Sequence, residues 1–296
     1  MQGILEWGIS VISAIQTVRT PFLDSFFQVV SNIGSEYFYF AALPLICTLI
    51  NRKIGIRIAI TIMVSVIINS LIKNFVEEPR PFLIDPSVTV IFENGFGFPS
   101  GHTQQAALFF GLLIFYVRKW WVIIPSALWV GLIGLSRMYL GVHYPTDVIG
   151  SICVAGAILF VHRQLVLHDK NLWNSATRLP LFLAVFFGSI LAIVVVPAKD
   201  MVSSGALVSG FVAGLLTTPV VIAPLSSNWI ERFKIAAITG AVLLLFFVGL
   251  KFLFPKYGED YFMIFSFIRF FLCGFVLNAL PLQWAQLTKE AARKQD

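Results

Sequence analysis

Charged residues are scarce in this chain of 296 residues, at 12% of the sequence, and there are only three cysteines. A soluble domain carries about 25% charged residues, so this composition excludes a soluble globular protein. Cys47, Cys153 and Cys273 each lie alone inside an apolar run, a spacing that fits neither a disulfide framework nor a zinc site. The first residues, Met1–Gly3, lack the basic segment that opens a cleaved signal peptide.

Hydrophobic residues make up 58% of the chain, and the mean hydropathy is +0.86. They form long continuous runs, which are typical of transmembrane helices of ~20 residues rather than of the alternating strands of a β-barrel. The net charge of +6 does not indicate nucleic acid, because the basic residues lie in short clusters between apolar runs. We therefore predict an all-α, polytopic transmembrane helical bundle that contacts membrane lipids and binds no nucleic acid.

The apolar runs define about nine predicted spans. An amphipathic helix at the membrane interface is expected over residues 4–18, within an N-terminal segment 1–30. The segment 31–165 holds five spans, and the segment 166–296 holds four more and a basic cytoplasmic tail. The spans are expected at roughly 34–50, 55–73, 102–117, 120–136, 145–161, 179–197, 203–224, 235–254 and 261–281.

Lysine and arginine are unevenly distributed over the predicted loops. One set of loops, which includes Arg118 and Lys119, carries most of the cations, and the other carries most of the acids. The positive-inside rule places the first set and the C-terminus in the cytoplasm, and the N-terminus and the loop 74–100 outside. Five polar residues then meet at the outer membrane face: Lys73, Arg80, His102, Arg137 and His143.

The hexapeptide 98–103 combines a turn, a hydroxyl and an imidazole. Pro99 ends the preceding segment, Ser100 is a favourable helix N-cap, and Gly101 lets a ligand approach the backbone. The start of a helix offers unpaired N–H groups and the positive end of a dipole, which favour a bound phosphate. His102, on the first turn, exchanges a proton near neutral pH. Taken alone, this stretch favours a capped helix with an interfacial histidine.

His143 and Asp147 are four residues apart, so they lie close together across one helical turn. The carboxylate can accept one ring N–H, fix the tautomer and leave the other nitrogen free to attack. Pro145 suits the first turn of the fifth span. The alternative, an interfacial histidine with a capping Asp147, stays open at this point.

Lys73, Arg80 and Arg137 are three cations at membrane depth without three matching acids, and such groups are costly and usually functional. Singly, each has a structural alternative: Lys73 can extend to the interface, and Arg137 can anchor the fourth span. Arg80 can pair with Glu77 or Glu78. A phosphate dianion accounts for all three cations at once. No carboxylate cluster for Mg²⁺ and no His/Cys set for zinc is evident, so we expect metal-independent chemistry without a cofactor.

Three motifs stand in order along the chain: Lys-x6-Arg-Pro at 73–81, Pro-Ser-Gly-His at 99–102 and Ser-Arg-x5-His-x3-Asp at 136–147. Together they resemble the signature motifs of the type 2 phosphatidic acid phosphatase superfamily, over about residues 30–165. The resemblance implies a core of about six helices and metal-independent hydrolysis of lipid phosphates or lipid pyrophosphates.

The resemblance also implies roles for single residues. His143 would be the nucleophile that forms a phosphohistidine, Asp147 would orient it, and His102 would be the general acid and then the base. The implied ligands of the substrate phosphate are Lys73, Arg80, Ser100, Gly101 and Arg137.

These inferences favour a membrane-embedded phosphatase in a bacterial plasma membrane, with its active site on the extracytoplasmic face. Asp147 counts against a sugar phosphate, because the similar glucose-6-phosphatase branch typically lacks an acid there. A phosphotransferase on the same scaffold is an alternative. A lipid or solute transporter, with helices broken at Pro197, Pro219 and Pro224, is the alternative of a different class. The sequence does not specify the lipid or the oligomeric state.

Three polar residues inside apolar runs are expected to be structural. Asn69 and Ser70 are predicted to form interhelical hydrogen bonds. Arg269 is costly within the last apolar run. It is expected to pair with Asn278 or Asp260, to touch a lipid headgroup, or to act as a structural tie.

Overall fold

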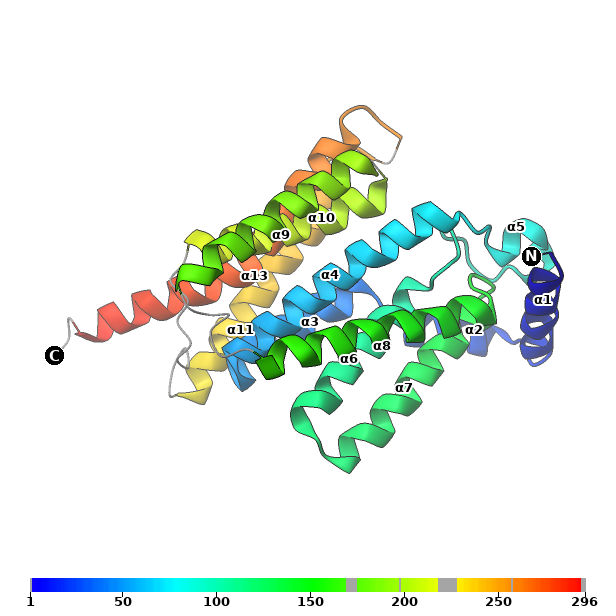
Figure 1. Ribbon diagram of the computed structural model, residues 1–296, viewed down its shortest axis with the longest axis horizontal. Helices are drawn as coiled ribbons and strands as arrows, with labels where there is room; N and C mark the ends of the chain where they lie inside the picture. The colour runs from blue at the N-terminus through cyan, green and yellow to red at the C-terminus, as the bar shows by residue number, and fades with distance from the viewer. Residues whose placement is uncertain (1, 169–174, 197, 218–227, 257, 294–296) are drawn as a thin grey trace. The chain divides into compact units, whose positions relative to one another are not determined.

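The computed structural model describes residues 2–168, 175–196, 198–217, 228–256 and 258–293. The described chain is helical and contains no strand, which confirms the predicted all-α class (Figure 1). It forms two compact units. The first comprises Met1–Phe38 and Ile68–His168, and the second comprises Tyr39–Ile67 and Asp169–Asp296.

Both units are built from helices, of which α4 passes from the second unit into the first. The first unit contains α1 (Gln2–Gln16), α2 (Pro21–Ile33), the end of α4 (Arg52–Val76), α5 (Pro81–Ile84), η2 (Pro86–Val88), α6 (Gly101–Val117), α7 (Trp120–Tyr139) and α8 (Pro145–His168). The second contains most of α3 (Glu36–Leu45), η1 (Ile46–Ile50), the start of α4, α9 (Ser175–Val195), α10 (Lys199–Thr217), α11 (Trp229–Leu244), η3 (Leu245–Gly249), α12 (Leu250–Leu253) and α13 (Phe262–Arg293).

N-cap residues and prolines mark the starts of several helices in the first unit. Thr20 caps α2 by accepting a hydrogen bond from the N–H of Leu23 at 3.2 Å, and Pro21 follows it at a position where a missing N–H costs nothing. Pro81 and Pro145 open α5 and α8 in the same way. Proline therefore occupies the first position of α5 and of α8, each of which follows a predicted motif residue.

Packing in the first unit brings three helix ends together. α6 packs against α7 and α8, and α2 packs against α7. The tilted rings of Phe27 and Tyr139 pack with their centroids 4.3 Å apart, in a buried cluster that also contains Leu140 and Val142. The end of α7 and the loop that follows it are thus held in the protein interior.

The N-terminal helix predicted over residues 4–18 is observed as α1. Ile12 is fully buried against Val88 and Tyr144. Gln16 Nε2 donates to the carbonyls of Val88 and Tyr139, each at 2.8 Å. α1 is therefore fixed to the loop after α5 and to the end of α7. Its location at a membrane interface stays a prediction.

Glycine allows close backbone packing in the second unit, where α10 and α13 lie side by side (Figure 1). A Cβ added at Gly274 of α13 would lie 2.1 Å from the carbonyl oxygen of Leu207 on α10. One added at Gly210 of α10 would lie 1.9 Å from the carbonyl oxygen of Phe271. Small residues at such contacts are typical of helices that pack within a membrane.

Arg269 of α13 is part of an aromatic cluster in the second unit. Its guanidinium carbon lies 4.7 Å from the ring centroid of Phe270 and 5.6 Å from that of Phe247, which is cation–π geometry. Asn278 instead accepts a hydrogen bond from Arg52 Nη2 at 2.9 Å. The described contacts of Arg269 therefore support the structural tie among the predicted alternatives.

Five helical segments of the described chain are long and apolar enough to cross a membrane, and the protein is an integral membrane protein. They are Arg52–Ile84, Trp120–Tyr139, Pro145–Leu167, Trp229–Leu253 and Phe262–Pro281. The total of about nine spans and the six-helix core stay predictions. Pro197, Pro219 and Pro224, on which the transporter alternative rests, lie outside the described residues, as do the last three residues of the predicted tail.

We expect Gly274→Ala to destabilise the second unit, because the added methyl group would be forced between two backbones. Overpacking of this kind costs about 1–3 kcal/mol. Gly188→Ala on α9 is the matched control, since nothing lies within 4 Å of a Cβ added there. Thermal unfolding in detergent measures both variants. Identical midpoints for Gly274→Ala, Gly188→Ala and the wild type would contradict the close approach of α10 and α13.

Candidate active site

The Pro-Ser-Gly-His stretch lies at the start of α6, as the sequence predicts. Ser100 is fully buried at the N-cap position, but its hydroxyl contacts Thr103 Oγ1 at 3.0 Å and does not cap a backbone N–H. The N–H of Ser100 donates to the carbonyl of Asp147 at 3.3 Å. The N–H groups of Gly101 and His102 belong to the first helical turn, where amides lack an intrahelical acceptor and can bind an anion.

Neighbouring helices hold this stretch in place. Asn69 Nδ2, on α4, donates to Gln104 Oε1 of α6 at 2.8 Å and to the carbonyl of Pro99 at 3.3 Å. The interhelical hydrogen bond predicted for Asn69 is therefore confirmed. Ser151 Oγ, on α8, donates to the carbonyl of Ser100 at 2.9 Å. Both α4 and α8 thus fix the backbone at the start of α6.

Arg80 lies immediately before α5 and is only 3% exposed. Its Nε donates to the carbonyl of Gly95 at 2.9 Å, and its Nη2 donates to that of Asn94 at 3.1 Å. Its Nη1 donates to the carbonyl of Val142 at 3.0 Å. Three backbone carbonyls therefore fix the guanidinium plane.

One carboxylate joins the arginines of the first and third motifs. Arg137, on the last turn of α7, is 1% exposed, and its Nη1 donates to Ser31 Oγ at 2.5 Å. Its Nη2 forms an ion pair with Glu93 Oε1. Glu93 Oε2 lies 3.1 Å from Arg80 Nη1. The carboxylate of Glu93 therefore lies between the two guanidinium groups.

Lys73 contacts the same loop as the two arginines. It lies near the end of α4, is 8% exposed, and donates from Nζ to the carbonyl of Phe96 at 2.7 Å. The acceptors of Arg80 and Arg137 include Glu93, Asn94 and Gly95 of this loop. The segment 93–96 is thus a common partner of all three predicted phosphate-binding cations.

His143 follows α7, is 1% exposed and contacts Asp147 on the first turn of α8. Its Nδ1 lies 3.0 Å from Asp147 Oδ2, which also accepts the N–H of Tyr144 at 3.0 Å. Its other nitrogen, Nε2, lies 3.4 Å from Arg80 Nη1. This is the contact that the four-residue spacing predicts, with one ring nitrogen held by the acid and the other beside a cation.

The electrostatic environment determines the protonation states of His143 and Glu93, which both lie in loops. Burial, together with the positive charges of Arg80, Arg137 and Lys73, holds the pKa of His143 well below its usual range. Burial also opposes ionisation of Glu93, but the positive charges around it, that of Arg137 above all, outweigh this effect and lower its pKa to about 2. At neutral pH the imidazole of His143 is therefore neutral and Glu93 is ionised.

His102 occupies the first turn of α6, within electrostatic range of Glu93 and His143. Its backbone lies against the end of α2, where a Cβ added at Gly34 would lie 3.2 Å from the carbonyl oxygen of His102. The structure therefore brings all eight predicted site residues into one unit, and both histidines interact with the same cations.

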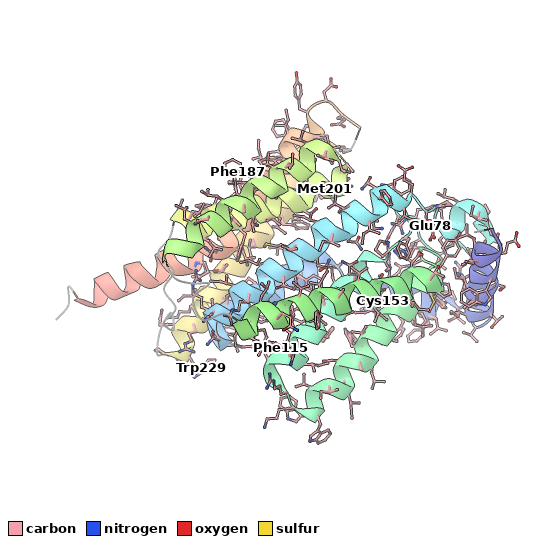
Figure 2. All side chains as sticks on the ribbon, viewed as in Figure 1. Glu78, Phe115, Cys153, Phe187, Met201 and Trp229 are labelled. Atoms are coloured by element: carbon pink, nitrogen blue, oxygen red, sulfur yellow. The ribbon has the colours of Figure 1, made fainter. Side chains whose placement is uncertain are left out.

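Two acids of the loop between α4 and α6 belong to the site, although sequence reasoning did not assign them to it. Glu93 bridges the two arginines, and it was not among the acids, Glu77 and Glu78, that the sequence offered as partners of Arg80. Glu78 lies beyond the end of α4 (Figure 2), and its carboxyl group interacts with that of Asp147.

Gly97 lies where the carboxyl groups of Glu78 and Asp147 approach each other. A Cβ added at Gly97 would lie 3.3 Å from Asp147 Oδ2 and 3.5 Å from Glu78 Oε1. The Gly97 N–H donates to the Glu78 carbonyl at 2.8 Å. The acidic composition of this loop was the available signal, but composition does not specify which acid meets which cation.

Among the described residues, no group of three or more His, Cys, Asp and Glu side chains is arranged to hold a metal ion. Three buried cations and the first amides of α6 are present in this part of the structure instead. Such groups bind anions through charge-assisted hydrogen bonds. The arrangement therefore fits a phosphate-sized anion.

The helical fold and this buried cluster of cations define a polytopic membrane protein with a candidate anion site, and comparison with known proteins identifies the family. The family model described as the PAP2 superfamily matches residues 54–170. The bacitracin transport permease protein BcrC of Bacillus licheniformis is 30% identical over 187 residues, which cover 49% of this chain and 86% of that protein. The chain belongs to the PAP2 superfamily, as the three motifs predict.

Two further matches show how far this similarity extends. Lipid phosphate phosphatase delta of Arabidopsis thaliana is 28% identical over 170 residues, which cover 51% of this chain but only 40% of the length of that protein. The crystal structure of Aquifex aeolicus LpxE matches with a TM-score of 0.50 and 24% identity, over 53% of this chain and 95% of that chain. The solved structure shows that the helical fold of the matched part is shared.

The low pKa of His143 makes a prediction for the pH dependence of catalysis. A histidine usually gains a proton as the pH falls through its pKa of about 6.5. Because the pKa of His143 is lowered, its imidazole stays neutral at that pH and is protonated only at a lower pH. We expect the acidic limb of kcat/KM, corrected for ionisation of the substrate, to lie below that value. Lys73→Gln removes one of the charges responsible and should move the limb upward. A limb that stays at the same pH in this variant would contradict the assignment.

Proposed function

We propose that this protein is a membrane-embedded phosphatase that hydrolyses lipid phosphates or lipid pyrophosphates through a phosphohistidine intermediate. The observation that carries this proposal is the orientation of His143, whose Nδ1 contacts Asp147 Oδ2 at 3.0 Å while Nε2 lies beside Arg80. A neutral imidazole oriented by a carboxylate, next to a cation that can bind phosphate oxygens, is suited to attack phosphorus.

In the first step, Asp147 keeps the ring proton on Nδ1 of His143, so the lone pair is on Nε2. Nε2 forms a bond to phosphorus, and the bond between phosphorus and the lipid oxygen breaks. His102, whose protonated form the charge of the bound phosphate dianion stabilises, gives its proton to that leaving oxygen. Arg80 and Arg137 stabilise the charge on the equatorial oxygens, with Lys73 and the first amides of α6.

In the second step, neutral His102 takes a proton from water, whose oxygen attacks phosphorus. The bond between phosphorus and Nε2 of His143 breaks, and inorganic phosphate leaves. His102 keeps this proton for the next cycle, so both histidines have returned to their starting protonation states. The three cations balance the phosphate charge, and so we propose that the reaction requires neither metal nor cofactor.

A lipid substrate is proposed because the site lies at one end of helices α6, α7 and α8 of an integral membrane protein. The name of the Arabidopsis relative also specifies a lipid phosphate. We propose lateral entry of the lipid and access of water from the extracytoplasmic side of a bacterial plasma membrane. The distribution of basic loops supports an external N-terminus, a cytoplasmic C-terminus and about nine spans.

The proposed organisation retains the three segments inferred from the sequence. Residues 1–30 form the N-terminal segment with the interfacial helix α1 and most of α2. Residues 31–165 form the phosphatase core of about six helices, and residues 166–296 form the additional spans and basic tail. The family match over residues 54–170 supports the position of the core.

Transport is the alternative of a different class, and the name of the Bacillus licheniformis relative favours it. Transfer of the phosphoryl group to another hydroxyl is the alternative within the same chemistry. Transport does not require an oriented nucleophile, whereas both hydrolysis and transfer do. The contact between His143 and Asp147 therefore supports phosphoryl chemistry.

We expect His143→Ala to abolish phosphate release by the detergent-solubilised protein in the presence of EDTA, because the nucleophile is lost. His102→Ala should slow release by about 10²–10⁴-fold, as expected for loss of a general acid and base. The substrate panel contains phosphatidate, phosphatidylglycerol phosphate, undecaprenyl pyrophosphate, sphingosine phosphate and glucose 6-phosphate. His162→Gln is the control, since His162 contacts Tyr116 at 2.9 Å outside the site.

Phosphate release at the native rate by His143→Ala would contradict the mechanism. Solute or lipid transport by the same variant would favour the transporter. Labelled lipid phosphate given together with acceptor alcohols separates hydrolysis from transfer, because the label then goes to inorganic phosphate or to the alcohol.

A further inference from the structure

Glu93 is an acid in the middle of the cations that would bind substrate phosphate. Its two oxygens contact two different arginines, Oε2 at 3.1 Å from Arg80 Nη1 and Oε1 in an ion pair with Arg137 Nη2. A phosphate group presents its oxygens to guanidinium groups in the same manner. The carboxylate and a phosphate that used both of these donors would therefore exclude each other.

We propose that the Glu93 carboxylate is an internal occupant of the phosphate subsite, and that substrate or product phosphate binds only by displacing it. Glu93 thereby limits the affinity of the site for phosphate and favours release of the product. This inference rests on the proposed function, because it assumes that Arg80 and Arg137 bind the phosphate of the substrate.

The two arginines are held in place without Glu93. The carbonyls of Gly95, Asn94 and Val142 fix Arg80 through all three of its nitrogens. Ser31 fixes Arg137 through Nη1. Removal of the carboxylate therefore leaves both guanidinium groups oriented, and it frees Nη1 of Arg80 and Nη2 of Arg137 from their acidic partner.

Displacement requires movement of the Glu93 side chain and little else. That side chain is 26% exposed, whereas the side chain of Arg137 is 1% exposed, so the carboxylate has a path to solvent and the arginine has none. The carbonyls of Asn94 and Gly95 remain bonded to Arg80 and keep the backbone in place. The side chain can rotate outward while the loop stays attached.

Charge strengthens the competition. Glu93 is ionised at neutral pH, and its negative charge adjoins the position that a phosphate dianion would take. Like charges at this distance repel strongly in a buried site. Displacement of Glu93 therefore stabilises a bound phosphate in two ways: it frees the donors of Arg80 and Arg137, and it removes the repulsion between two negative charges.

The experiment measures binding of inorganic phosphate to the detergent-solubilised full chain by isothermal titration calorimetry. Inorganic phosphate is the product of the proposed reaction, so nothing is consumed during the measurement. The proteins are the wild type, Glu93→Gln, Glu93→Ala and Glu6→Gln. Glu6 is an exposed acid of α1, so the last variant controls for the loss of one negative charge.

We expect both Glu93 variants to bind phosphate at least about 10-fold more tightly than the wild type. In the wild type only the fraction of molecules in which Glu93 has left the site can bind, and the apparent affinity is reduced in proportion to that fraction. Glu6→Gln should bind it as the wild type does. A competitive Ki for phosphate against the lipid substrate should fall by the same factor. Glu93→Gln preserves the size of the side chain, so it reports on the charge even where Glu93→Ala does not fold.

Equal or weaker binding in the Glu93 variants would overturn the inference, because it would mean that Glu93 supports the arginines rather than competing for them. If the wild type then still releases phosphate from a lipid, the proposed function stands. If no protein binds phosphate and no lipid phosphate is hydrolysed, the proposed function fails, and this inference fails with it.

Discussion

The burial of three cations at the helix ends of one unit is the constraint on which the site depends. Lys73, Arg80 and Arg137 are 8%, 3% and 1% exposed, and a buried charge is costly unless hydrogen bonds and opposite charges compensate it. The segment 93–96 supplies part of this compensation, through three carbonyls and one carboxylate. The loop between α4 and α6 is therefore shaped by the cations it covers.

The same cations determine the chemistry of the neighbouring histidine. Burial and their positive charge together lower the pKa of His143 and keep it neutral, while Asp147 holds its Nδ1. In the proposed mechanism they also bind the phosphate and stabilise the transition state. In this proposal a single group of charges orders a loop, activates a nucleophile and receives the substrate.

Much of the fold and part of the site are predictable from the sequence because they depend on local patterns. Long apolar runs gave the helices, α6 begins at Gly101 directly after the proline turn, and the spacing of His143 and Asp147 predicts their contact. The partners of the arginines are not predictable in this way. Arg137 meets Ser31, which is 106 positions away in the sequence, through packing of α2 on α7.

The position of Glu93, the break in the first predicted span and the contacts of Arg269 are also not predictable from local sequence patterns. The loop that carries Glu93 has no periodicity, so only its folded path shows which acid lies between the arginines. The run expected at 34–50 consists of α3 followed by the π-helical turn η1, a break in hydrogen bonding that hydropathy does not detect. Arg269 packs against aromatic rings because α13 and η3 are neighbours, which is a tertiary effect.

The most direct test of the central claim is to locate the phosphoryl group on the protein during turnover. The protein is mixed with lipid phosphate that is isotopically labelled in its phosphate, quenched in alkali within the first turnover, and analysed by peptide mass spectrometry. The account predicts an acid-labile phosphoryl group on the imidazole of His143. Efficient release of phosphate with no label on His143, or with label on another residue, would contradict it.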